Sequence, residues 1–101
     1  LGDIENNIKN FKAVNKKGRK IKLTWKKSND AYEYQIAYAC NKKFTKNVNY
    51  KNVKSKGTKS YIIKKLKKGK TYYFKMRVYY ILNRKMKYGN WSVTKKVKIK
   101  K

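Results

Sequence analysis

Side chains that could catalyse a reaction are few in this 101-residue chain and lie far apart. There is no histidine, so the commonest general base near neutral pH and the commonest neutral metal ligand are both missing. Of the four carboxylates, Asp3 and Glu5 lie near the N-terminus, while Asp30 and Glu33 flank the start of an expected strand. This spacing gives no sign of two carboxylates held across a cleft, as glycoside hydrolysis requires.

Cys40 is the single cysteine of the chain. It has no histidine to activate it and no second cysteine for a zinc site or an internal disulfide. Its place at the end of an expected strand favours a half-buried structural role over a nucleophile, with a disulfide to another chain as a further alternative. The sequence therefore predicts no catalytic residue, no metal site and no cofactor, and we expect that the protein is not an enzyme.

Cationic side chains are the one abundant group with binding chemistry. Thirty-one lysines and arginines stand against four acidic residues, giving a formal net charge of +27 and a pI near 10.3. The codons of an AT-rich genome would explain many lysines, asparagines, isoleucines and tyrosines. They do not explain the scarcity of Asp and Glu, whose codons are also AT-rich. Because so much like charge opposes compaction, we expect an anionic environment or partner.

Alternation of apolar and polar residues indicates strands that position these side chains. In residues 20–26 every odd position is apolar and every even position is polar, and residues 72–78 carry the longest such pattern. Strands are expected over residues 8–14, 20–26, 34–38, 50–53, 60–63, 72–78 and 91–99. Short turn segments with Gly, Asn or Ser separate them, which is typical of a sandwich or barrel. We expect one domain over residues 8–101 after a lead or linker of residues 1–7, and no membrane insertion, because no apolar run reaches about 18 residues.

Three segments in order resemble the fibronectin type III family. Leu23-Thr24-Trp25 is similar to the family's second strand, whose Trp fills the core. Residues 66–72 are similar to its Leu-x-Pro-Gly-x-x-Tyr pattern, with Lys68 at the Pro position. Gly89-Asn90-Trp91-Ser92 resembles the segment that opens its last strand. The structural landmarks are thus Trp25, Leu66, Tyr72 and Trp91.

This resemblance implies an all-β, immunoglobulin-like two-sheet sandwich of about seven antiparallel strands. It implies that Tyr72 forms a tyrosine corner, in which its hydroxyl bonds nearby backbone. The version of the motifs found here looks most like domains of Gram-positive bacterial surface and secreted proteins. Such domains are spacers or adhesive units without cofactors, so the resemblance implies an extracellular or cell-surface location and neighbouring domains in a larger chain.

One outward strand face is the first candidate contact surface. If the even-numbered residues of 72–78 face the core, their odd-numbered neighbours form a row toward solvent. The members of this outward row are Tyr73, Lys75, Arg77 and Tyr79. In a fibronectin-like sandwich the last strand lies beside this one, so Lys96 and Lys98 should extend the face. Cations would meet phosphates or carboxylates and tyrosine rings could stack on sugars or bases, although an ordinary solvated strand face is the alternative.

Three partner classes remain open. The first is an anionic polymer, such as wall teichoic acid or an acidic glycan, held by the surface charge. The second is nucleic acid, bound without specificity, because no helix-turn-helix, zinc module or RNP-like pattern is present. The third is another protein, contacted through a loop expected over residues 82–88. The candidate contacts of that loop are Arg84, Lys85, Met86, Lys87 and Tyr88, unless Met86 and Tyr88 instead cover the end of the sandwich.

Overall fold

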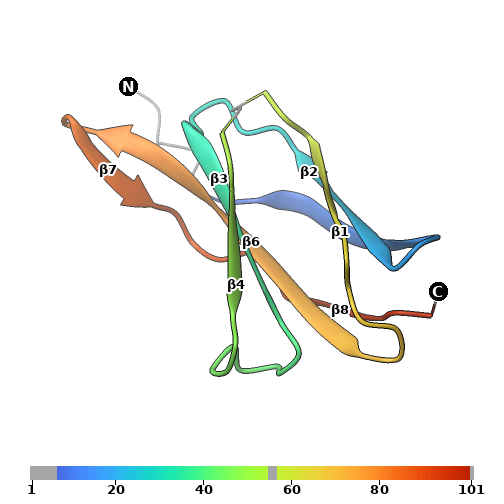
Figure 1. The fold of residues 1–101 in the computed structure, drawn as a ribbon. Coiled ribbons are helices and arrows are strands. Elements are labelled where there is room, and N and C mark those ends of the chain that lie inside the picture. Colours follow the sequence, from blue (N-terminus) through green and yellow to red (C-terminus); the bar gives the residue numbers. More distant parts are fainter. Residues whose placement is uncertain (1–6, 55–56, 101) are drawn as a thin grey trace.

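The computed structural model describes residues 7–54 and 57–100, which form eight strands (Figure 1). The strands are β1 (Lys9–Lys16), β2 (Lys20–Lys26), β3 (Glu33–Ala39), β4 (Asn49–Val53), β5 (Ser60–Ile63), β6 (Thr71–Leu82), β7 (Lys85–Tyr88) and β8 (Lys95–Lys98). Within the described ranges there is no helix, and hence no helix able to span a membrane. The expected N-terminal lead, with Asp3 and Glu5, lies outside the described residues except for Asn7.

Two antiparallel sheets stack to form a sandwich (Figure 1). One sheet has the order β1-β2-β5, and the other has the order β4-β3-β6-β7, with β8 also pairing β6. Strands β7 and β8 pair with successive stretches of the same edge of β6. The expected all-β two-sheet sandwich is therefore confirmed, with eight strands where about seven were expected.

The core lies between the sheets and follows the alternation in the sequence. On β2, Ile21, Leu23 and Trp25 are buried, and on β6 the even-numbered residues from Tyr72 to Val78 are buried. Within this core the ring centroids of Trp25 and Tyr34 lie 5.3 Å apart. Strand β6 thus has one face packed on the core and one face turned outward, which is what allows it to display a surface row.

The C-terminal strand differs from expectation, because it begins at Lys95 rather than at Trp91. Register shows why: Tyr79 pairs with Tyr88 and Phe74 pairs with Lys95, so four residues of β6 face the six residues 89–94. The segment therefore has two residues more than β6 opposite it, and it leaves the strand pairing in a bulge. Ser92 keeps contact through its backbone N–H, which donates to the Met76 carbonyl at 2.8 Å, and through its hydroxyl, which accepts from the Met76 N–H at 3.0 Å.

The bulge also overturns the expected side-chain parity. In the continuous strand expected over residues 91–99, Trp91 and Val93 would share the core-facing side with Val97 and Ile99. Ile99 is fully buried, but Val93 is 65 % exposed and Trp91 packs on the outer face instead. Strict alternation holds only within a paired ladder, and residues 89–94 leave that ladder.

Candidate functional site

The outer face of the five-stranded sheet carries the outward row, as the alternation of β6 requires. Tyr73, Lys75, Arg77 and Tyr79 are each half-buried on this face. The register places Lys96 opposite Tyr73, and Lys98 opposite Thr71, so both lysines extend the same face and both are exposed. The structure therefore brings the six candidate anion contacts onto one surface.

Aromatic rings enclose the two central cations of this row. The guanidinium carbon of Arg77 lies 3.6 Å from the centroid of the Tyr88 ring and 4.1 Å from that of Trp91. The Lys75 ammonium lies 4.4 Å from the Trp91 centroid and 4.3 Å from that of Phe44. Cations so close to ring faces are attracted by the negative potential of the π-systems. Trp91 therefore sits between the two cations and joins them.

This series of stacked groups continues beyond Arg77, where the rings of Tyr79 and Tyr88 lie 4.5 Å apart and nearly parallel. We call the whole series the cation–aromatic ladder. Its members in order are Tyr79, Tyr88, Arg77, Trp91, Lys75 and Phe44. Arg77 Nε also donates a hydrogen bond of 2.9 Å to Gln35 Oε1, which fixes the guanidinium over β3.

The cation–aromatic ladder limits which side chains of the outward row are available to bind a ligand. Burial, and then the neighbouring Arg77 charge, lower the pKa of Lys75, as expected for an ammonium that has lost part of its water. Arg77 and Lys75 are already engaged on both sides by rings. Of the six candidate contacts, Tyr73, Lys96 and Lys98 are consequently the ones outside the cation–aromatic ladder. Sequence reasoning missed Phe44, Gln35 and the outward turn of Trp91.

The expected loop over residues 82–88 is wrong, because these residues belong to a β-hairpin. Strand β6 continues to Leu82, and a two-residue turn of Asn83 and Arg84 leads into β7. Both turn residues have positive φ, 53° and 65°, as the two-residue type I′ hairpin requires. The hairpin extends beyond the rest of the sandwich (Figure 1).

Apolar side chains cluster on this hairpin. Its large exposed apolar residues are Ile81, Leu82, Met86 and Tyr88. Arg84, Lys85 and Lys87 lie among them and are exposed too. Met86, at 42 % exposed, does not cover the end of the sandwich, whereas Tyr88 is a member of the ladder. The register places Ile81, Met86 and Tyr88 on one face of the hairpin, and Leu82, Lys85 and Lys87 on the other.

The remaining landmarks serve the fold. Tyr72 forms the expected corner, since its hydroxyl accepts a 2.9 Å hydrogen bond from the Lys67 backbone N–H. Leu66 and Trp25 are buried in the core. Gly69, after Lys68 at the usual Pro position, has a φ of +84°, which glycine adopts without strain.

The described carboxylates and the cysteine do not gather into a metal site. Residues 7–54 and 57–100 contain no group of three or more Cys, Asp or Glu that could hold a metal ion. Glu33 lies 3.9 Å from the Lys54 ammonium, in an ion pair near the start of β3. Cys40 was expected to be half-buried but is exposed, because β3 ends at Ala39 and the chain turns outward.

Comparisons with known proteins agree with this architecture. Residues 6–94 match the family model of the fibronectin type III domain. Among solved structures, the FN1-FN3 domains of chicken CNTN1 match with a TM-score of 0.77 and 18% identity, over 98% of this chain and 31% of that one. The FN5 domain of Drosophila Lar gives 0.71 and 18%, over 94% and 96%. The fn3 domain of human contactin 1 gives 0.76 and 15%, over 98% and 80%. A search of curated protein sequences gave no match.

Proposed function

This chain belongs to the fibronectin type III family, and on that basis we propose that it is a non-catalytic module that holds anionic polymers at a cell surface. Domains of this family are generally binding or spacer modules, and they commonly occur in extracellular or surface proteins. We place the module in a surface or secreted protein of a Gram-positive bacterium, where wall teichoic acid and acidic glycans supply the polyanion. Its motifs support that assignment, since they resemble the domains of such proteins.

The observation that carries this proposal is a surface charge that the chain does not neutralise itself. Asp30 and Glu33 are the only carboxylates among the described side chains. The lysines and arginines are spread over the outer faces of both sheets and over the turns, on a body with extents of 47 × 25 × 19 Å. A polyanion that approaches from any side meets a positive potential, which raises its rate of association.

The kind of cation favours a diffuse mode of binding. Only three of the thirty-one cations are arginines, at positions 19, 77 and 84. Lysine is a strongly hydrated point charge, whereas arginine forms the bidentate forks of geometry-specific sites. Binding of this kind depends on the release of counterions, so its affinity falls steeply as salt rises.

Retention on immobilised teichoic acid and heparin, at about 50 mM and 200 mM salt, tests the proposal. We expect strong retention at the lower concentration and a loss of at least about tenfold at the higher one. Double-stranded DNA is the comparison polymer. Retention independent of salt would contradict the proposal, and tighter binding to DNA than to the wall polymers would favour nucleic acid as the partner.

The exposed hairpin favours a second candidate function, contact with an acidic protein segment. Among residues 7–54 and 57–100, β7 pairs with β6 alone, so a further strand could add along its other edge. Apolar residues of the added strand would pack on the face of Ile81, Met86 and Tyr88. Its acidic residues would meet Lys85 and Lys87 on the opposite face, and Arg84 at the turn.

Selection of peptides from a random library tests this candidate. We expect the selected peptides to alternate apolar and acidic residues, and to lose binding when Met86 is changed to Ser. Val93→Ser is the matched control, because Val93 is exposed outside the hairpin. Peptides without that alternation, or equal loss with both variants, would contradict the candidate.

A further inference from the structure

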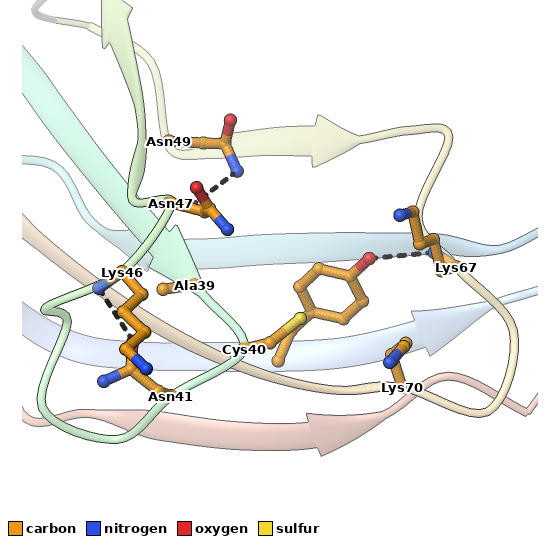
Figure 2. Close-up of a pocket in the computed structure, with 9 residues that line it drawn as sticks. Ala39, Cys40, Asn41, Lys46, Asn47, Asn49, Lys67 and Lys70 are labelled. Atoms are coloured by element: carbon orange, nitrogen blue, oxygen red, sulfur yellow. Dashed lines mark hydrogen bonds between the residues drawn. The ribbon is translucent and has the colours of Figure 1, made fainter.

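A cationic pocket opens at the end of the sandwich opposite the two described carboxylates. The loop between β3 and β4 forms one side and the turn between β5 and β6 forms the other. Figure 2 shows Lys46 and Asn47 on the first side, and Lys67 and Lys70 on the second. The pocket has a volume of about 410 Å³, and the backbone beneath it brings in Ala39 and Tyr72.

The loop side of this pocket is held by its own hydrogen bonds. Asn41 Oδ1 accepts from the Lys46 backbone N–H at 3.3 Å (Figure 2). It also accepts from the Thr45 N–H at 3.3 Å, and Asn41 Nδ2 donates to the Thr45 hydroxyl at 2.8 Å. The Phe44 N–H donates to the Asn41 carbonyl at 3.1 Å, and the Phe44 ring lies against Lys75 in the cation–aromatic ladder. The backbone that carries Lys46 is therefore fixed before any ligand arrives.

The turn side is held equally well. The Gly69 N–H donates to the Ile99 carbonyl at 2.8 Å, and the Ile99 N–H donates to the Lys70 carbonyl at 2.9 Å. The Lys67 N–H is bound to the Tyr72 hydroxyl, and the Lys67 carbonyl accepts from the Lys70 N–H at 3.2 Å. Two lysines thus stand on a turn that is tied to both β6 and the C-terminal segment.

Electrostatics at this pocket favour an anion. Three lysines line it, no carboxylate does, and none of the three makes an ion pair within the described part of the chain. Glu33 and Asp30 lie at the other end of β3, about 20 Å away for six strand residues. The Debye length is only about 8 Å at physiological ionic strength, so those carboxylates do not offset the local potential.

We infer that this pocket binds the phosphate of a phosphorylated polyol or sugar, which would be one repeating unit of the anionic polymer in the proposed function. Lysine is a frequent binder of phosphate, because its positive charge attracts the anion and its three N–H groups can donate hydrogen bonds to phosphate oxygens from several directions. The Asn47 amide supplies a further donor, and the apolar surfaces of Ala39 and Tyr72 suit the CH groups of a polyol. This inference rests on the proposed function and adds a defined site to its diffuse charge.

A titration of the ¹⁵N-labelled chain with glycerol 3-phosphate at low ionic strength tests the site. We expect saturable shifts of amide resonances in residues 40–49 and 66–72, and none with glycerol. Combined Lys46→Gln, Lys67→Gln and Lys70→Gln should weaken binding about tenfold, at a fraction of a kcal/mol for each exposed contact. The control removes equal charge at the far end, through Lys12→Gln, Lys26→Gln and Lys27→Gln, and should bind normally.

Cys40 gives an independent readout, because its thiol lines the same pocket and is the only thiol of the chain. Glycerol 3-phosphate should slow alkylation of Cys40 by iodoacetamide in the wild type, at constant ionic strength, and should not do so in the triple pocket variant. Shifts spread evenly over the surface, or equal loss of binding in the two triple variants, would overturn the inference. Tighter binding of glucuronate would overturn the assignment to phosphate.

Retention on the polymer separates this inference from the proposed function. Wild-type protein that binds teichoic acid, with an equal loss in both triple variants, would support surface charge and overturn the pocket. Wild-type protein that binds no polymer would overturn the proposed function, and the titration with glycerol 3-phosphate would still decide the pocket by itself.

Discussion

At the scale of single residues, the Tyr72 hydroxyl ties the turn before β6 to the strand itself. Replacing Tyr72 by Phe removes the 2.9 Å hydrogen bond from the Lys67 N–H and leaves the ring in the core. We expect the free energy of unfolding to fall by about 1 kcal/mol, as for one intramolecular hydrogen bond. Urea unfolding measures this loss. Tyr50→Phe, at a 56 % exposed tyrosine, is the control, and an equal loss there would contradict the assignment.

Tyr38 makes stability depend on pH in the alkaline range. Burial, and then the phenols of Tyr61 and Tyr72, raise the pKa of Tyr38 above its ordinary value of 10.0. As pH rises through 10, the unfolded chain loses this proton first, so the free energy of unfolding falls until the folded pKa is reached. Tyr38→Phe should lack this fall. Urea unfolding between pH 8 and 11 checks it, and profiles that stay parallel over that range would contradict it.

Lys75 also makes stability depend on alkaline pH, in the direction opposite to Tyr38, but it does so equally in the wild type and in the Tyr38→Phe variant. The lowered pKa of Lys75 means that its protonated form is less favoured in the folded chain, so the associated destabilisation is relieved as pH rises through the folded pKa. Both proteins share this effect. The difference between their profiles therefore reports Tyr38.

At the scale of elements, the sequence was most informative where strands are paired and least informative where pairing is interrupted. Strands β2 and β5 have the bounds that alternation predicted, because each has one buried face. The bulge over residues 89–94 follows from the registers of two strands against β6, which no local pattern contains. For that reason the outward row was predictable, whereas the placement of Trp91 between Lys75 and Arg77 was not.

The β6–β7 hairpin was missed because its turn lacks the usual signature. Asn-Gly marks a type I′ turn, since glycine accepts positive φ freely, but Arg84 holds the second position at 65°. We expect Arg84→Gly to stabilise the hairpin by about 0.5 kcal/mol, part of the penalty of a left-handed residue. Slower amide exchange in β7 would show it. Lys87→Gly, inside that strand, should instead speed exchange, and faster exchange in both variants would contradict the turn assignment.

At the scale of the whole molecule, the fold withstands its own charge because the core is continuous and the cations point outward. Apolar residues of both sheets meet between them, while the lysines lie on outer faces and turns. In the cation–aromatic ladder, the charges of Lys75 and Arg77 are stabilised by attraction to the aromatic rings beside them. Most of the other lysines in the described ranges have no aromatic ring or carboxylate beside them, so their charges repel one another through solvent. This repulsion is stronger in the compact folded state than in the expanded chain.

Salt should therefore stabilise this protein. Between about 10 mM and 300 mM sodium chloride the Debye length falls from about 30 Å to less than 8 Å, which is shorter than the smallest extent of the molecule, 19 Å. A relief of about 1 kcal/mol would raise Tm by roughly 4–8 °C for a domain of this size. Thermal unfolding followed by circular dichroism measures the change.

The control is a variant with six exposed lysines changed to Glu, namely Lys12, Lys26, Lys43, Lys59, Lys64 and Lys87. Each reversal lowers the net charge by two, so its Tm should respond less to salt. A wild-type Tm that is constant or falls over this range would show that self-repulsion is not a significant part of the stability of the fold.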